Sequence, residues 1–144
     1  MKNISFNNSD VSLVLKKKRV LKSFLTSIFE EEQYQFESVS FVFCSDAYLL
    51  PLNRKYLNHD TLTDIITFSL SDVAVPVVAE IYISVERVVE NAGSLNVPFM
   101  EELHRVMIHG ILHLCGYSDH LPGLKKQMRR KEDYFLSRLQ TVLW

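Results

Sequence analysis

Three histidines in the last third of the chain could together bind a metal ion. His109 and His113 are four residues apart, which on a helix is a turn of about 400° and leaves their imidazoles about 40° apart on one face. At that spacing both rings can reach one ion at about 2.0–2.1 Å. Gly116 is a natural left-handed stop for the helix, after which His120 can return to the same ion. Three imidazoles leave a fourth tetrahedral position open, which is typical of a catalytic zinc site.

Such a site would make a reactive water without choosing its target. Zinc held by three imidazoles lowers the pKa of bound water from about 15.7 toward about 7 and stabilises charge on a phosphoryl oxygen. Zinc proteases of the H-E-x-x-H type need the glutamate as base, and Gly110 stands in its place, which argues against peptide hydrolysis by that route. Nickel, copper and iron also suit three imidazoles. The alternative is that His113 is a satisfied core histidine and His120 a surface loop residue.

The other histidines and the cysteine near this motif are expected to take no part in it. His59 precedes an aspartate in a turn-like stretch and is expected on the surface, and His104 lies about 140° from His109 around the helix. Cys115 faces about 200° away from His113 and is expected to be a small core residue.

The histidine segment resembles a known family signature. Residues 109–120, HGILHLCGYSDH, resemble the pattern H-G-x-L-H-L-x-G-Y-D-H of the YbeY family of bacterial metal-dependent endoribonucleases. Residues 52–68, LNRKYLNHDTLTDIITF, resemble that family's L-N-x-x-Y-R-x-x-D-x-x-T-D-V-L-S-F, and residues 80–84, EIYIS, resemble the end of its G-D-I-x-I-S strand. The resemblance runs in order from about Ser38 to Glu132.

This resemblance implies a function and a set of ligands. It implies a single-strand-specific endoribonuclease that acts in 16S rRNA 3'-end maturation and ribosome quality control. It implies that His109, His113 and His120 hold one Zn²⁺ per chain. It also implies a cytoplasmic protein with ribosomal RNA and ribosomal proteins as partners.

The chain departs from the family pattern at three places. Ser118 leaves six residues between His113 and His120 instead of five, and Ala79-Glu80 replaces Gly-Asp. Leu57 stands where the family usually has an arginine implicated in RNA cleavage. Leu57 motivates a second hypothesis, a non-catalytic or weakly catalytic ribosome-assembly factor that binds RNA or ribosomal protein. A metal hydrolase of small esters or phosphates is a third.

Phosphodiester cleavage also needs a base and cations. Asp119 is expected to orient His120 through its other ring nitrogen, with proton acceptance from zinc-bound water as the alternative. Candidate phosphate-binding residues are Arg54, Lys55 and Arg87, each of which could instead be a solvated surface charge.

Strands and helices alternate along the chain. The patterns predict strands at Ile4–Asn7, Ser38–Cys44, Asp64–Leu70 and Val77–Ser84, with a loop at Ser71–Val75. They predict helices at Val11–Glu32, from the Ser45-Asp46 cap to about Tyr56, from Ser84 to a stop at Gly93, from Pro98 to Gly116, and from Pro122 to about Thr141. The order indicates an α+β (α/β-like) fold, one mixed sheet covered by about five helices. The resemblance implies that the sheet has four strands, and the metal helix is similar to that of zincins.

Composition sets the remaining limits. A length of 144 residues predicts a single domain, residues 1–144, and 47% hydrophobic and 23% charged residues are typical of a globular protein. A net charge of −1 excludes nucleic-acid binding by bulk charge alone, although the segment from Leu121 onward carries about +4. That asymmetry permits RNA to approach one side and equally describes a polar helix face. Two cysteines exclude a disulfide framework, and neither a signal peptide nor a membrane span is expected.

Overall fold

In the two central strands apolar residues alternate along the chain, and those on one face of the sheet form the core. The structure is a computed structural model, and it describes residues 2–71 and 75–143. Successive strand residues point to opposite faces, so one buried residue in every two gives a sheet with one apolar face. In β2 (Phe36–Cys44) and β4 (Val77–Ser84) the buried residues on that face are Val39, Phe41, Phe43, Ala79, Ile81 and Ile83.

The sheet is mixed, as the resemblance implied. Its strand order is β1-β2-β4-β3, with β1 at Asn3–Asn8 and β3 at Ile65–Ser69. β1, β2 and β4 are parallel, while β3 pairs antiparallel with β4 and forms an edge of the sheet. One side of β3 is therefore free of strand neighbours, and the cavity described below opens there.

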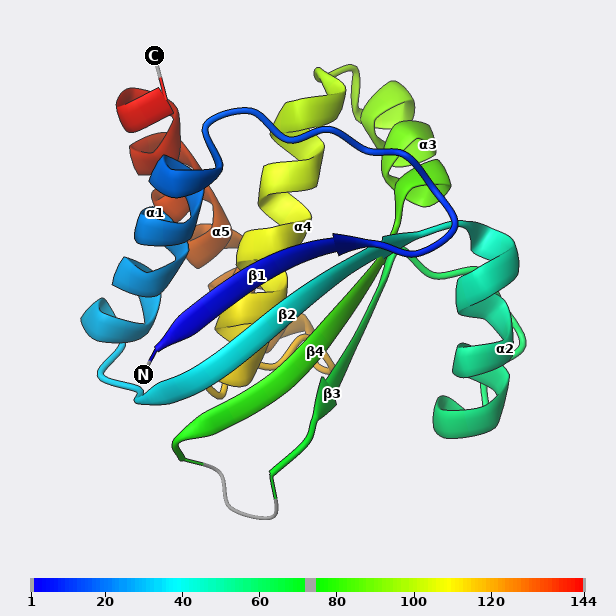
Figure 1. The fold of residues 1–144 in the computed structure, drawn as a ribbon, viewed down its shortest axis with the longest axis horizontal. Coiled ribbons are helices and arrows are strands. Elements are labelled where there is room, and N and C mark those ends of the chain that lie inside the picture. The colour runs from blue at the N-terminus through cyan, green and yellow to red at the C-terminus, as the bar shows by residue number, and fades with distance from the viewer. Residues whose placement is uncertain (1, 72–74, 144) are drawn as a thin grey trace.

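The helices cover the two faces unequally. α1 (Lys18–Glu31), α4 (Phe99–Leu114) and α5 (Pro122–Leu143) contribute to the main core, and α3 (Val85–Leu95) packs beside α4. α2 (Asp46–Leu57) packs on the opposite face through a small cluster formed by Leu49, Cys44 and Ile66. Figure 1 shows α2 on one side of the sheet and α1, α4 and α5 on the other, with α3 next to α2. Within the described residues the fold is thus a single α+β domain with five helices and a four-stranded mixed sheet.

A glycine lets α4 approach the sheet closely. A Cβ at Gly110 would lie 3.0 Å from the Cδ1 atoms of both Ile65 and Ile81. Ordinary carbon contacts are about 3.5–4.0 Å, so a larger residue would push the helix away from β3 and β4. The position that carries the catalytic glutamate in zinc proteases is therefore a packing contact in this chain.

Two predicted helix boundaries are wrong. The first helix begins at Lys18 and not at Val11, because Lys17 takes a left-handed conformation (φ 54°) and the buried stripe begins only at Leu21. The third helix continues through Gly93 to Leu95. Asn96 provides the left-handed cap (φ 58°), a conformation that asparagine tolerates.

The remaining expected elements agree with the structure within a few residues. Gly116 has φ 96° directly after α4, as expected for a left-handed helix stop. The predicted loop Ser71–Val75 includes residues 72–74, which lie outside the described residues. Of the helices in the part of the chain that the structure describes, none is both long and apolar enough to cross a membrane.

Candidate functional site

One face of α4 lines a cavity of about 770 Å³. The face follows helical spacing i, i+3, i+4, i+7 and i+11, so its residues stack along one side of the helix. In chain order it consists of Glu102, Arg105, Val106, His109 and His113. Two of the three predicted metal ligands are therefore on one wall of one cavity.

Three other segments complete the walls of the cavity. α5 contributes four residues at spacing i, i+3, i+4 and i+7, and the loop between α4 and α5 contributes Asp119 and His120. The edge strand β3, with the segment before it, forms the facing wall. The residues from α5 are Lys125, Met128, Arg129 and Glu132, and those from the β3 side are Leu57, His59, Thr63, Asp64, Ile65, Ile66 and Thr67.

His109 is held by a carboxylate on α5. Its Nδ1 lies 2.7 Å from Oε2 of Glu132, whose side chain is only 7% exposed. Because a carboxylate only accepts, Nδ1–H donates and, in the neutral imidazole, Nε2 carries the lone pair. Burial lowers the pKa of His109, but the hydrogen bond and charge of Glu132, with the nearby Asp119, outweigh it and raise the pKa overall.

His113 is oriented in the same way by a backbone carbonyl. Its Nδ1 lies 3.2 Å from the carbonyl oxygen of Tyr117, which follows the turn at Gly116. A carbonyl accepts, so Nδ1–H donates here as well, and Nε2 is again free as an acceptor. In metal sites, ligating histidines commonly donate their second N–H to a carboxylate or a carbonyl. Both rings of the α4 pair therefore have the tautomer that binding a metal through Nε2 requires.

The third histidine lines the same cavity but does not close a ligand set with the other two. His120 is exposed, and its backbone N–H donates to Ser118 Oγ at 3.3 Å. Within residues 2–71 and 75–143, no group of three or more His, Cys, Asp or Glu side chains is close enough together to hold a metal ion. The donor chemistry of His109 and His113 fits zinc, and participation of His120 stays a prediction.

Asp119 lies against a different histidine from the one expected. Its Oδ2 is 3.6 Å from Nε2 of His109, and among the described residues no hydrogen bond joins it to the ring of His120. The loop between α4 and α5 therefore brings this carboxylate to the free nitrogen of His109. Its expected role in orienting His120 is not what the geometry favours.

The buried end of the cavity is acidic. Burial raises the pKa of Asp64 and of Glu102, and Oε1 of Glu102 is buried without a hydrogen-bond partner among the described residues. Arg105 is shared among carboxylates: Asp133 at 2.8 Å, Glu132 at 3.5 Å and Glu102 at 3.7 Å. The positive charge of Arg105 is consequently balanced by carboxylates of the protein itself.

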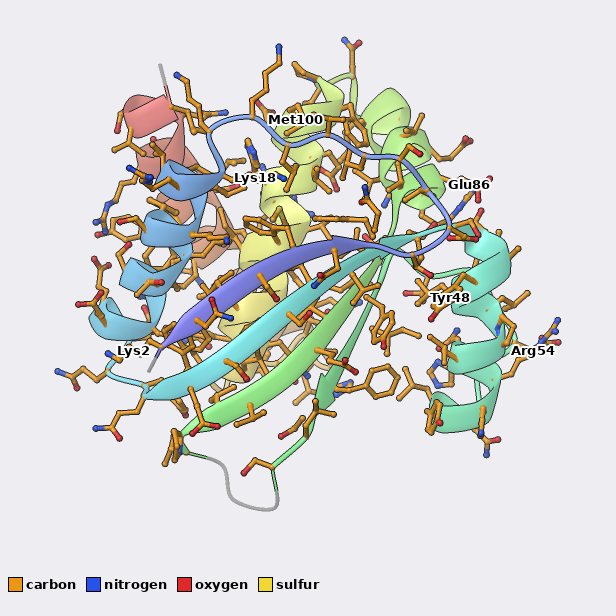
Figure 2. The ribbon with its side chains drawn as sticks, viewed as in Figure 1. Lys2, Lys18, Tyr48, Arg54, Glu86 and Met100 are labelled. Atoms are coloured by element: carbon orange, nitrogen blue, oxygen red, sulfur yellow. The ribbon has the colours of Figure 1, made fainter. Side chains whose placement is uncertain are left out.

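The three cations predicted to bind phosphate are not among the residues that line the cavity. Arg54 pairs with Asp60 and points away from the sheet in Figure 2, and Lys55 lies over the ring of Tyr56 at 5.2 Å. Arg87 is bound to Asp46 at 3.0 Å, which ties the start of α3 to the start of α2. Contact of these cations with RNA stays a prediction.

Local patterns in the sequence did not reveal several residues of the cavity wall. His59 is exposed, as expected, and it also lines the cavity, because the left-handed cap Asn58 (φ 59°) turns the chain back from α2 toward β3. His104 is outside the cavity lining and Cys115 is buried in the core, as predicted. The missed residues on α5 had a signal in their spacing, since Lys125, Arg129 and Glu132 are at i, i+4 and i+7. Glu102 and Arg105 had the same kind of signal, since they lie seven and four residues before His109 on α4. For Asp64, which comes just before β3, local spacing gave no signal.

Comparisons with known proteins agree with the resemblance. A family model described as Endoribonuclease YbeY matches residues 3–140. Proteins named Endoribonuclease YbeY in Flavobacterium psychrophilum and Cytophaga hutchinsonii are 46% and 42% identical to it, over 90% and 93% of this chain and 91% and 94% of their own. A solution structure from Thermotoga maritima superposes with a TM-score of 0.67 at 29% identity, over 98% of this chain and 91% of that one. The matching family model and the curated relatives together show that this chain belongs to the Endoribonuclease YbeY family.

Proposed function

We propose that this chain is a zinc-dependent, single-strand-specific endoribonuclease of the bacterial cytoplasm. It acts on ribosomal RNA, in 16S rRNA 3'-end maturation and ribosome quality control, in contact with ribosomal proteins. Endoribonuclease activity is supported by family membership and by relatives that carry that name at up to 46% identity. The metal, the RNA and the partners are the parts that the proposal adds.

The main support for the zinc site is that His109 and His113, the pair on α4, have the same tautomer. His109 and His113 each donate Nδ1–H to an oxygen, at 2.7 Å and 3.2 Å, and keep Nε2 as acceptor beside one cavity. His120 lines that cavity too and would be the third ligand. Bound there, zinc supplies a Lewis acid for the phosphoryl group and a nucleophile at neutral pH.

The chain's own residues have separate tasks in this proposal. Glu132 and the carbonyl of Tyr117 fix the orientation of the two ligand rings. Asp119, 3.6 Å from Nε2 of His109, is placed to accept a proton from a group that reacts next to that nitrogen. Gly110 keeps α4 against β3, so the histidines and the edge strand share one cavity.

The proposal is tested with histidine variants on single-stranded RNA. Zinc-loaded protein should cut a labelled single strand much faster than the same strand in a duplex. His113→Ala should lose both zinc and cutting, because it removes one of two adjacent ligands. His104→Gln is the matched control, since His104 is on the same helix and does not line the cavity.

Two results would refute parts of the proposal. Cutting by His113→Ala at the parent rate would exclude the histidine site as the source of activity. Equal cutting of single strand and duplex would exclude the proposed specificity.

A specific residue favours a second candidate function. Leu57, where the family pattern has an arginine, lines the cavity and is 45% exposed. An apolar side chain here supports the hypothesis of a weakly catalytic or non-catalytic assembly factor that binds RNA or ribosomal protein. In that case the parent protein binds RNA without cutting it, and Leu57→Arg creates activity. Cutting by the parent at a rate that Leu57→Arg does not raise would exclude this candidate.

A further inference from the structure

The cations at the cavity differ in whether their charge is available. Arg105 lies among Glu102, Glu132 and Asp133, so a bound anion would compete with three carboxylates for it. Lys125 and Arg129 also line the cavity. In the described part of the chain their side chains make neither an ion pair nor a hydrogen bond.

The position of this pair on α5 explains why its charge is free. Lys125 and Arg129 are one turn apart on the α5 face that also carries Glu132, the residue bonded to His109. Both are exposed, whereas Glu102 is buried at the acidic end of the cavity. Arg129 and Glu102 line the same cavity. Burial raises the pKa of Glu102, and the charge of Arg129 lowers it only in part. The cavity is thus acidic inside and basic at its exposed margin.

The other basic residues of α5 have different surroundings. Lys131 donates to Glu32 at 2.9 Å and Arg138 to Glu31, which ties α5 to α1. Lys126 and Arg130, each one residue further along from the pair, do not line the cavity. Of the basic residues of the described α5, only Lys125 and Arg129 combine a free charge with the histidine cavity.

We propose that Lys125 and Arg129 bind backbone phosphates of single-stranded RNA at the margin of the histidine cavity. This inference rests on the proposed function for the identity of the ligand. The lysine supplies a point charge with three donors, and the arginine a planar fork that matches a phosphate. Phosphates held by Lys125 and Arg129, one by each, would keep the adjoining nucleotides over His109 and His113, while the buried carboxylates would exclude phosphate from the inner end.

The test is RNA binding under conditions in which cleavage cannot occur. The probe is a fluorescent single-stranded oligonucleotide with 2'-O-methyl groups, and the readout is anisotropy at several salt concentrations. Lys125→Gln/Arg129→Gln should weaken binding about 10- to 50-fold, and the slope of log affinity against log salt should fall by about 1.4, or about 0.7 per phosphate contact. Both side chains are exposed, so the double variant is expected to fold, and circular dichroism checks this.

The matched control removes the same charge from the same helix. Lys126→Gln/Arg130→Gln should weaken binding less than about threefold, because those residues do not line the cavity. Equal weakening by the two double variants would overturn the proposal in favour of the general charge of α5. Unchanged binding by Lys125→Gln/Arg129→Gln, or no RNA binding by the parent protein, would also overturn it.

A third variant tests whether the charge acts within the cavity. Leu57 lies on another wall of the same cavity, so Leu57→Arg added to the Lys125→Gln/Arg129→Gln variant returns a cation to it. Affinity should recover at least about threefold, and no recovery would contradict a phosphate bound in this cavity.

The two proposals fail in different ways. If the parent protein binds the oligonucleotide through Lys125 and Arg129 but cuts no RNA, the proposed nuclease activity is refuted and this inference is supported. If Lys125→Gln/Arg129→Gln cuts RNA as fast as the parent protein, the inference is refuted and the nuclease proposal is not.

Discussion

At the scale of single residues, the contact between Glu132 and His109 links two helices to the proposed chemistry. The carboxylate is buried on α5, and it accepts from a histidine on α4 at 2.7 Å. The bond fixes which nitrogen of His109 is free. Glu132 is therefore a positioning residue, which acts through His109.

Removal of Glu132 should weaken zinc binding. Glu132→Ala should lower zinc affinity about 10- to 100-fold, as found for partners of metal-bound histidines, and Glu132→Gln should recover part of this because its amide oxygen can still accept. The measurement is competition against a chelator of known affinity. Asp133→Asn is the control, because Asp133 also contacts Arg105 but is exposed and does not line the cavity. Equal affinities of Glu132→Ala and Asp133→Asn would contradict the positioning role.

Glu102 should reduce stability at neutral pH. Its carboxyl is buried and its Oε1 has no hydrogen-bond partner among the described residues. Burial raises its pKa despite the charges of Arg105 and Arg129, and Asp64 and Glu132 raise it further. A carboxyl whose pKa is higher in the folded than in the unfolded chain adds to the stability of the fold at low pH, where it is protonated. That contribution is lost as pH rises through the folded pKa.

The corresponding variant is Glu102→Gln. The free energy of unfolding of Glu102→Gln minus that of the parent should increase from pH 4 to pH 8, by about 1 kcal/mol or more. Denaturant unfolding at the two pH values measures it. A difference that stays constant with pH would mean that Glu102 ionises as easily in the folded as in the unfolded chain.

At the scale of elements, the approach of α4 to the sheet depends on Gly110. Sequence patterns predicted every helix and strand, because apolar periodicity and capping residues are local properties. They failed at Lys17 and Asn96, where a left-handed residue sets the helix boundary, since the signal from either residue type is weak. The pairing of α4 with α5 through His109 and Glu132, 23 residues apart, was outside the reach of local patterns.

Two glycine variants separate packing from helix propensity. Gly93→Ala, with no atom within 4 Å of the added Cβ, should raise the free energy of unfolding by about 0.5–1 kcal/mol. Gly110→Ala places a Cβ 3.0 Å from two isoleucines and should leave the protein about 1–3 kcal/mol less stable than Gly93→Ala does. Denaturant unfolding of both variants checks this, and equal stabilities would mean that the contact at Gly110 relaxes freely.

At the scale of the whole molecule, the net charge is only −1, but the basic residues of α5 fall into two groups with different surroundings. Lys131 and Arg138 bind α1, whereas Lys125 and Arg129 face the cavity. The sequence showed the basic segment but not this division, because it depends on which face of α5 packs against which helix. The histidine pair was predictable from spacing alone. The spacing of Lys125 and Arg129 placed them on one face of α5 but did not show that this face meets the histidine pair.

The fold should persist without metal. The main core lies between the sheet and α1, α4 and α5 and is built from buried apolar side chains, none of which is a proposed ligand. Chelation should therefore leave the far-ultraviolet circular dichroism and a cooperative thermal transition in place, with Tm lowered only by the loss of ligand binding. Unfolding on addition of the chelator would show that the site is structural.

The central claim is that zinc held by the histidine cavity gives this chain its endoribonuclease activity. The most direct test is the cleavage rate of single-stranded RNA as zinc is added stepwise to metal-free protein. The rate should rise in proportion to zinc, level off at one equivalent per chain, and stay at background in His113→Ala. A rate that is already maximal without metal, or that rises equally in His113→Ala, would contradict the account.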